Sequence, residues 1–226
     1  ISFDYAAQAR DILRHCVHQH ELVKDGDPMW DPKNHLIKFV PESPFSDPSY
    51  HLPHFYELFA RMADEADRPF WHKAASASRE YLIKSIHPQT GMASEYAEFD
   101  GTPKRLFHDG EYYSDAYRVA MNVGLDAAWF GNTDVTPQSG SGTNPYGSQE
   151  GTAARFDGLM NNLQTFFSEK TRYGEYHNYT IRGEALNQPA LHPVAIIATT
   201  AAASLATTGK YRMAWVRDFW NQPLRK

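Results

Sequence analysis

The sequence predicts an all-α fold in which antiparallel helical hairpins stack with their long loops on one rim, as in an α/α barrel. Three observations lead to this prediction. Apolar residues recur at helical spacing in seven segments, and few stretches alternate as strands do. Short joins at "DEADRP" and "TTGKY" pair neighbouring helices. Much longer loops connect the others, so these loops are expected to gather at the opposite end.

The first helix is expected over about the first twenty residues, which carry one apolar face. Pro69 and Pro193 suit first helical turns, Ser114 suits an N-cap, and Gly209 lies just past a helix end. A small hairpin is expected around Arg182-Gly183. The six further helices are expected at Phe55–Ala66, Phe70–Ile83, Ser114–Phe130, Ala153–Phe167, Val194–Ala206 and Tyr211–Trp220.

Long loops between helices are the expected place for a functional site, because loops of this length are uncommon unless they have a role. One of them contains "TPQSGSGTNPYGSQEG", whose composition is also that of a simple surface insertion. The long loops cover Lys24–Pro53, Ser85–Tyr113, Gly131–Thr152 and Ser168–His192.

Composition narrows the class of protein. The 226 residues fit a single domain over 1–226, and the net charge of -5 without a basic run argues against a nucleic-acid partner. No apolar stretch is long enough for a membrane span and the N-terminus lacks a signal-peptide layout, so we expect a soluble, cytoplasmic protein. One cysteine, Cys16, excludes an internal disulfide. We find no motif for a cofactor or a zinc ion.

His15 and His18 have the i, i+3 spacing of helical metal ligands, but no acid accompanies them in the sequence. We therefore expect them to be solvated or packed and predict no metal site.

Asp115, in "EYYSDAYRV", has two interpretations. An acid in a first helical turn is stabilised by the helix dipole, which is a purely structural role. Alternatively, Arg118 keeps the carboxylate ionised beside the hydroxyls of Tyr113 and its neighbours, which would make Asp115 a base for water. Both interpretations fit the residues.

Acids and aromatic residues crowd the loop before Asp115, a combination that suits sugars because hydroxyls need acceptors and ring faces need stacking partners. We expect most of these acids to be solvated. Tyr50, at a loop-to-helix junction, could orient a water or simply pack there. His192, at the end of a long loop, could enter a helix or touch a substrate. The acids of the loop are Glu95, Glu98, Asp100, Asp109 and Glu111.

The segments "SDPSYHLPHFYELFA", "EYYSDAYRVAMNVGLDAAWFG" and "PALHPVAIIATTAAASLA" together resemble glycoside hydrolase family eight, most closely its reducing-end xylose-releasing exo-oligoxylanases. The resemblance covers nearly the whole chain and departs from the family in a longer insertion around Pro137–Gly151. It implies an (α/α)6 barrel and hydrolysis of β-1,4-xylosidic bonds in xylo-oligosaccharides with inversion. This would be one step of oligoxylan degradation.

The resemblance also implies roles for particular residues. Asp115 would be the general base, Tyr50 would hydrogen-bond the attacking water, and Arg118 would support Asp115. Substrate contacts would come from Tyr113 and from the loop around His192, with Leu191 and Pro193 closing the cleft on the leaving-group side. No metal is implied.

The general acid of the family lies in an N-terminal segment for which this chain has no counterpart, and seven helices are fewer than the twelve of the complete barrel. We therefore expect residues 1–226 to be the C-terminal majority of the catalytic domain, with the N-terminal part of the barrel as its partner. Alone, the chain is expected to hydrolyse poorly or not at all. The alternatives are a non-catalytic sugar-binding fragment and another α/α-barrel sugar enzyme, such as an epimerase or an endo-acting β-glycanase.

Overall fold

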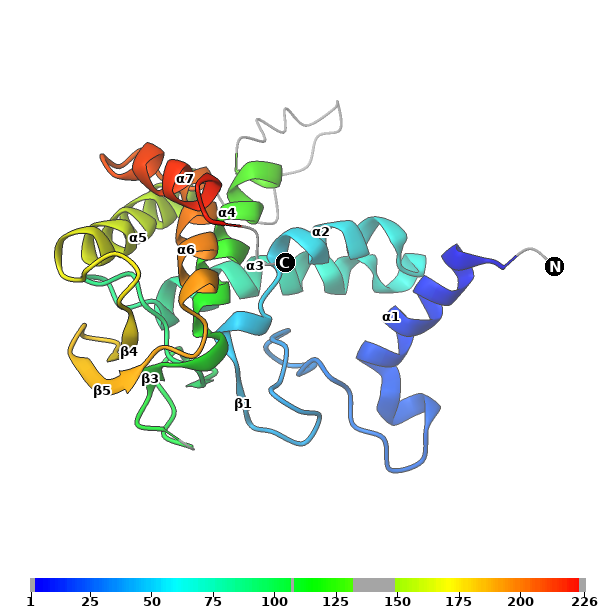
Figure 1. Ribbon diagram of the computed structural model, residues 1–226. Coiled ribbons are helices and arrows are strands. Elements are labelled where there is room, and N and C mark those ends of the chain that lie inside the picture. The colour runs from blue at the N-terminus through cyan, green and yellow to red at the C-terminus, as the bar shows by residue number, and fades with distance from the viewer. Residues whose placement is uncertain (1–2, 107, 132–148, 224–226) are drawn as a thin grey trace.

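The computed structural model describes residues 3–106, 108–131 and 149–223, and it is mostly helical in that part of the chain, as the sequence predicts. Figure 1 shows α1 at one end of the molecule and the later helices gathered at the other end, with α2 and α3 between them. The seven α-helices of the described residues are α1 (Tyr5–Leu22), α2 (Pro53–Met62), α3 (Arg68–Ser85), α4 (Arg118–Phe130), α5 (Gln149–Glu169), α6 (Pro193–Ala202) and α7 (Arg212–Trp220).

Short 3-10 helices adjoin several of these helices, and one of them corrects a predicted boundary. Ser114 is not an N-cap, because it lies inside the 3-10 helix η3 with a φ of 45°, and Tyr113 precedes that helix. The prolines are placed as predicted, since Pro69 and Pro193 occupy the first turns of α3 and α6. The 3-10 helices are η1 (Pro48–Tyr50), η2 (Glu65–Asp67), η3 (Ser114–Tyr117) and η4 (Ala203–Leu205).

Five short strands form two small antiparallel sheets within the described residues. The predicted hairpin is present as β4 and β5, and Gly183 in its turn has a φ of 94°, which favours glycine. The third strand of that sheet, β3, ends next to η3 and was not predicted. The strands are β1 (Phe45–Ser46), β2 (Ala97–Glu98), β3 (Glu111–Tyr112), β4 (His177–Thr180) and β5 (Ala185–Pro189).

The core divides into two main apolar clusters. The larger cluster unites α3 to α7, and its centre includes Met160, Leu163 and Val123. The smaller cluster holds α1 against α2 and α3 around Trp71 and Tyr56. Helices α4 and α6 approach so closely that a Cβ on residue 124, a glycine, would lie 2.2 Å from a backbone oxygen of the α6–η4 junction. This close packing fixes α4, which follows η3 directly.

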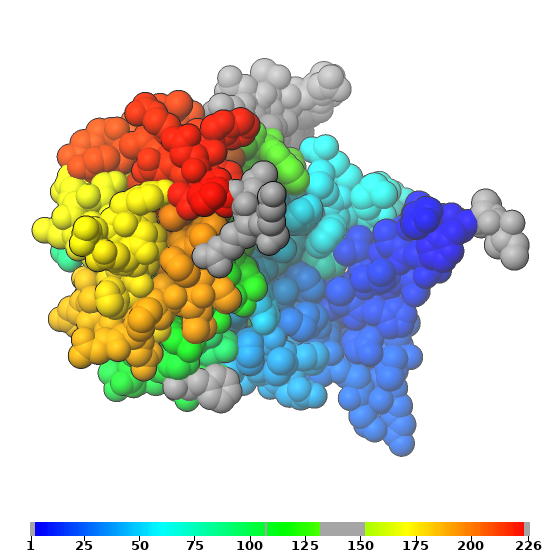
Figure 2. Space-filling model, viewed as in Figure 1, coloured from blue at the N-terminus to red at the C-terminus, as the bar shows by residue number. Residues whose placement is uncertain are grey.

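The space-filling view shows α1 and the segment after it projecting from the rest of the molecule (Figure 2). In the part of the chain that the structure describes, no helix is both long and apolar enough to cross a membrane. Residues 132–148, which include most of the predicted loop Gly131–Thr152 and of the insertion Pro137–Gly151, lie outside the described residues.

Candidate active site

Asp115 and Arg118 form an ion pair at the start of α4. The Nη2 atom of Arg118 lies 2.6 Å from Oδ2 of Asp115, and both side chains remain partly exposed. Because η3 continues into α4, the three-residue spacing brings both side chains to the same side of the helix start. A partly exposed carboxylate with a guanidinium on one oxygen can still contact a water or a sugar with its other oxygen.

Ser114 gives the backbone before Asp115 an unusual conformation. Its φ of 45° lies in the left-handed region, which costs a non-glycine residue roughly 1–2 kcal/mol. Strained residues of this kind occur preferentially at functional sites. This conformation lies where the chain passes from β3 into η3, one residue before Asp115.

Tyr50 belongs to the 3-10 helix η1, which packs against η3 and α4. Two side chains hold its turn: Asn122 of α4 donates to the Ser49 carbonyl at 2.9 Å, and the hydroxyl of Tyr56 donates to the Tyr50 carbonyl at 3.0 Å. Asp47 caps the turn through its Oδ1 atom, which accepts from the Ser49 N–H at 2.7 Å. These contacts hold η1 against η3, the 3-10 helix that contains Asp115, although Tyr50 lies 65 positions before Asp115 in the sequence.

Three carboxyl groups affect one another near Tyr50. The pKa of Asp47 is raised to about 7, chiefly by burial; the hydrogen bonds from Ser49 lower it, and the negative charges of Glu95 and Asp115 add to the rise. Burial likewise raises the pKa of Glu95, with Asp115 adding to the effect and His108 opposing it. Glu95, which is only 9% exposed, is therefore an exception to the expectation that most acids of this loop are solvated.

The phenols in this region respond to the same charges. Burial raises the pKa of Tyr50, Asp47 raises it next, and Arg118 opposes both. Burial and the carboxylates raise the pKa of Tyr96 to about 12. Both phenols thus stay protonated at ordinary pH and can donate hydrogen bonds. The rings of Tyr50, Tyr96, Phe39 and Phe45 also contact one another, with centroids 4.8–6.0 Å apart.

Tyr113 and His108 contact each other beside these acids, with ring centroids 3.8 Å apart. His108 also lies 3.9 Å from carboxylate oxygens of both Glu95 and Glu111. This loop borders a polar cavity of about 510 Å³, whose opposite wall is β5. The cavity has the size of a small-molecule site, and Asp115 is not among the residues that line it.

The three residues Leu191, His192 and Pro193 are at the entry of α6. His192 packs edge-on against Tyr117 of η3, with centroids 6.0 Å apart, so the loop lies close to the start of α4. Leu191 is 55% exposed. The three residues line a mainly apolar groove of about 880 Å³ together with Tyr117 and the end of α7.

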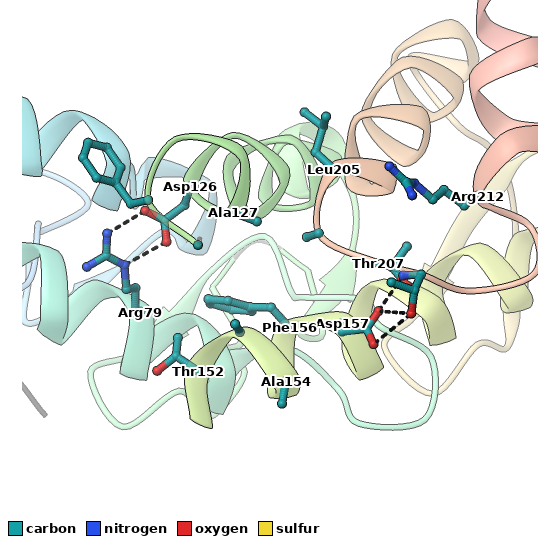
Figure 3. A pocket seen from close by; sticks show the side chains of 15 residues that line it. Arg79, Asp126, Ala127, Thr152, Ala154, Phe156, Asp157, Leu205, Thr207 and Arg212 are labelled. Atoms are coloured by element: carbon teal, nitrogen blue, oxygen red, sulfur yellow. Dashed lines mark hydrogen bonds and ion pairs between the residues drawn. The ribbon is translucent and has the colours of Figure 1, made fainter. Parts of the chain in front are cut away.

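A separate cavity of about 440 Å³ lies at the other end of α4, away from the predicted residues (Figure 3). Arg79 there donates to both carboxylate oxygens of Asp126, at 2.7 and 2.8 Å, and to Glu57 at 2.8 Å. Burial lowers the pKa of Arg79, but the two carboxylates raise it more. Its charge is therefore satisfied by neighbouring side chains, and the contacts indicate a structural role.

His18 has two acidic partners, one three residues later in the same helix and one from a distant segment. Nε2 of His18 lies 2.8 Å from Asp67, and its Nδ1 lies 3.0 Å from Glu21, so the expectation that no acid accompanies it was wrong. Among residues 3–106, 108–131 and 149–223, no three His, Cys, Asp or Glu side chains are grouped as ligands of a metal ion would be.

Sequence reasoning missed Asp47 and Tyr96 and assigned Glu95 no role. An Asp before a proline signals a turn, which is what Asp47 caps, but its burial depends on packing against residues far along the chain. Tyr96 adjoins Glu95 in the acid-rich loop, where the mixture of acids and aromatic residues was the available signal.

Comparisons with known proteins point to one group of enzymes. No family model matches the chain. The chain is 51% identical over 227 residues to the reducing-end xylose-releasing exo-oligoxylanase Rex8A of Paenibacillus barcinonensis, covering 99% of this chain and 54% of that protein. It is 46% identical to the reducing end xylose-releasing exo-oligoxylanase of Bifidobacterium adolescentis, and the match covers 99% of this chain and 55% of that protein. The chain thus spans about half the length of the curated relatives it matches.

Solved structures agree with the sequence comparison. The structure of Rex8A complexed with xylose matches with a TM-score of 0.85 over 99% of this chain and 54% of that one, at 51% identity. A crystal structure of a reducing-end-xylose releasing exo-oligoxylanase matches at 48% identity, also with a TM-score of 0.85. This match covers 99% of the present chain and 54% of the other. The chain is therefore a close homologue of the reducing-end xylose-releasing exo-oligoxylanases of glycoside hydrolase family eight.

Proposed function

We propose that this chain supplies the general base and the leaving-group side of an active site that removes xylose from the reducing end of xylo-oligosaccharides, with inversion. The observation that supports it most strongly is the Asp115–Arg118 ion pair next to the turn that carries Tyr50. The homology to reducing-end xylose-releasing exo-oligoxylanases also supports the proposal. Structures of such relatives hold xylose or xylobiose.

The proposed base is Asp115. Inversion needs one carboxylate that takes a proton from water and a second carboxylic acid that protonates the departing oxygen, about 6.5–9.5 Å away. Arg118, at 2.6 Å, holds one carboxylate oxygen of Asp115 and leaves the other oxygen available to a water. The general acid, by the family resemblance, belongs to a segment N-terminal to the matched region.

Tyr50 is the proposed partner of the attacking water. Its phenol stays protonated, since burial and the neighbouring carboxylates raise its pKa, and it extends from a turn that Asn122 and Tyr56 hold in place. A water between this phenol and Asp115 would be oriented before the sugar arrives. Orientation of this kind lowers the barrier because less freedom is lost at the moment of reaction.

The entry of α6 is the proposed wall of the leaving-group side. Leu191, His192 and Pro193 lie beside Tyr117, which directly precedes Arg118. A wall here leaves room for one xylose beyond the cleaved bond, so the enzyme acts from the chain end. Tyr113, stacked on His108, is proposed to contact the sugar from the opposite loop.

We also propose that residues 1–226 form the C-terminal majority of a single α/α-barrel domain, completed by an N-terminal part that carries the general acid. The coverage of about half of each relative supports this. The full-length protein is then the active species, and the 226 residues alone are expected to turn over little substrate.

The test uses the full-length protein and xylotriose with ¹³C in its reducing-end xylose. We expect labelled free xylose together with unlabelled xylobiose whose new reducing end first appears as the α-anomer in NMR spectra, because a β-bond is cleaved with inversion. Asp115→Asn is expected to lower the rate about 10²–10⁴-fold, the usual contribution of a general base. Asp11→Asn, a half-exposed acid on α1, serves as the control.

The results separate the proposal from its alternatives. Unlabelled free xylose would place cleavage at the other end and contradict exo action from the reducing end. Calorimetric binding of xylotriose without any product would favour a sugar-binding protein. An Asp115→Asn variant that releases xylose at the full rate would show that Asp115 is not the base. Conversion of the sugar to an epimer without cleavage, unchanged in the variant, would favour an epimerase.

A further inference from the structure

The turn η1, which carries Tyr50, is tied to two of the helices around it through its backbone carbonyls. Asn122 of α4 donates from its Nδ2 atom to the Ser49 carbonyl at 2.9 Å. The hydroxyl of Tyr56, on α2, donates to the carbonyl of Tyr50 itself at 3.0 Å. These two hydrogen bonds connect neighbouring residues of the turn to different helices.

A third tie connects the turn to α3. His51, which directly follows η1 and is fully buried, has its Nδ1 atom 2.8 Å from the Ser78 hydroxyl of α3. Its Nε2 atom lies 2.9 Å from the Ser46 hydroxyl, which donates to the Ile37 carbonyl at 2.7 Å and therefore accepts from the ring. Both ring nitrogens are thus bonded, and this tie does not depend on α4.

Of these three ties, only that of Asn122 leads to the helix that follows Asp115. One turn of 3-10 helix separates Asp115 from Arg118, and one turn of α-helix separates Arg118 from Asn122. The three side chains therefore follow one face of a continuous helical segment. The proposed base, its arginine and the amide that holds the turn of Tyr50 belong to one element, which packs closely against α6 as described above.

Asn122 is an unusual residue for a helix core. It is only 1% exposed, and its Oδ1 atom has no hydrogen-bond partner among the described residues. Burying an amide whose hydrogen bonds are incomplete is unfavourable, and an apolar side chain would avoid that cost. Packing alone therefore does not account for an asparagine at this position, whereas its bond to the backbone of η1 does.

We propose that Asn122 is a positioning residue: its amide holds the turn of Tyr50 at a fixed distance from Asp115, so that the phenol and the carboxylate reach the same attacking water. This inference rests on the proposed function, because it concerns the water that Asp115 activates. Since Asn122 is buried, it acts through the backbone of η1 and does not touch the sugar.

The physical reason is that one water must be met by two groups from different segments. A water held between a phenol and a carboxylate lies about 2.6–3.2 Å from each, so a shift of η1 by about 1 Å breaks one of the two hydrogen bonds. A misplacement of that size can cost about 100-fold in rate, even when it originates away from the reacting atoms. Without the Asn122 amide, the ties to α2 and α3 still keep the turn folded, and only its distance from Asp115 is released.

Asn122→Leu tests the proposal, because leucine has the same branched shape but donates no hydrogen bond. We measure kcat and KM of the full-length protein for xylotriose. The variant is expected to lose about 10–100-fold in kcat. Its KM is expected to stay within about threefold of wild type, because the lost interaction concerns the reacting water and not the binding of the sugar.

Gln164 provides the matched control, since it is a second amide with 1% exposure. It donates to the Thr200 carbonyl at 3.0 Å and to the Ser204 hydroxyl at 2.8 Å, and its Oε1 atom likewise has no partner in the described part of the chain. These bonds join α5 to α6 and η4, and not to η1. Gln164→Met is expected to lower the midpoint of thermal unfolding at least as much as Asn122→Leu, while its kcat stays within about twofold of wild type.

Asn122→Asp changes only whether the side chain can donate. An ionised carboxylate has no proton for the Ser49 carbonyl, whereas a protonated carboxyl donates to it as the amide does. Burial favours the protonated form as the pH falls. The kcat of this variant, divided by that of wild type at the same pH, is therefore expected to rise about tenfold from pH 8 to pH 5. A merely structural role would change the stability of the variant with pH and leave this ratio constant in the folded protein.

Crystal structures of full-length wild type and Asn122→Leu measure the separation of the Tyr50 hydroxyl and the Asp115 carboxylate without reference to activity. A change of about 0.5 Å or more, with the bonds of Tyr56 and His51 kept, supports the inference.

Three results would overturn the inference: an unchanged separation, a kcat of Asn122→Leu near that of wild type, or an equal loss of kcat in Gln164→Met. If Asn122→Leu does not fold, the Asn122→Asp ratio decides, and a ratio that is constant with pH contradicts the inference. If wild type releases no xylose at all, the proposed function fails, and the two crystal structures still decide whether Asn122 sets the separation of Tyr50 and Asp115.

Discussion

The two ends of α4 each hold an aspartate against an arginine, yet the surroundings differ. Near the end of the helix, Asp126 and Arg79 are both more than nine-tenths buried, and Glu57 binds the same guanidinium. At its start, Asp115 and Arg118 are 32% and 41% exposed. Two further carboxyls, of Asp47 and Glu95, have raised pKa values there. Both buried carboxylates near the end of α4 bond to a guanidinium, so we call it the matched end. At the start, which we call the unmatched end, Asp47 and Glu95 form no ion pair with a lysine or arginine of the described residues.

This difference shows how charge can serve structure or chemistry on one helix. Matched buried charges hold their partners in fixed positions, and removing one of them leaves another unpaired. Unmatched carboxyls keep protons that ordinary acids release, which is what proton transfer requires. The unmatched end is where η1, η3 and the entry of α6 converge.

The largest effect is expected from removing Arg79, the cation that Asp126 and Glu57 share near the end of α4. Arg79→Met leaves Asp126 and Glu57 buried without their cation, so the free energy of unfolding is expected to fall by about 3–5 kcal/mol. Urea unfolding of the full-length protein measures it. Arg14→Met, which breaks an exposed ion pair with Asp64, is the control and should change stability much less. Equal losses in both variants would contradict a special role for the matched end.

The next effect concerns Asp47 and depends on pH. Its pKa is raised from 3.8 to about 7, so between these values the folded chain keeps a proton that the unfolded chain releases, and the free energy of unfolding falls as the pH rises. Asparagine does not ionise, so the Asp47→Asn variant does not lose stability in this way. It is expected to be more stable than wild type by as much as about 4 kcal/mol at pH 8 and nearly equal to it at pH 4. If the free energies of unfolding of wild type and Asp47→Asn change in parallel with pH, then Asp47 does not keep a proton in the folded chain.

A smaller effect on the rate is expected from the exposed pair. Arg118→Met removes the cation from Asp115 and is expected to lower kcat about 10–100-fold, equivalent to about 1.4–2.8 kcal/mol, with little change in stability because the pair is partly exposed. Xylose release and urea unfolding are measured together. Arg155→Met removes a more exposed arginine on α5 and should leave both unchanged. If Arg118→Met loses as much stability as Arg79→Met, the arginines at the two ends of α4 have the same structural role.

The smallest effect is expected at Ser114. Ser114→Gly and Ser114→Ala both remove the hydroxyl, but only glycine adopts a φ of 45° without strain, so the glycine variant is expected to be more stable than the alanine variant by roughly 1 kcal/mol. Thermal unfolding compares them directly. If alanine proves as stable as glycine, the backbone before Asp115 is not strained in solution.

The sequence by itself determined the helices and the local contacts. Helical periodicity and the prolines placed the helices to within a few residues, because these signals act between residues close in the chain. The pairing of Asp115 with Arg118 could also be expected, since three-residue spacing brings them together. The motifs indicated the enzyme family, and the comparisons confirm that homology.

Only the tertiary structure decided which acids are buried and beside which groups. Glu95 and Asp109 look alike in one loop, but the side chain of Glu95 is 11% exposed whereas that of Asp109 is 76% exposed. Asp47 acquires its raised pKa chiefly from burial, and the charges of Glu95 and Asp115, which lie far from it in the sequence, add to the rise. Desolvation and charge repulsion depend on distances in space, and spacing along a chain carries no record of them. Ser114 likewise adopts a left-handed φ of 45°, which serine does not favour locally, where β3 leads into η3.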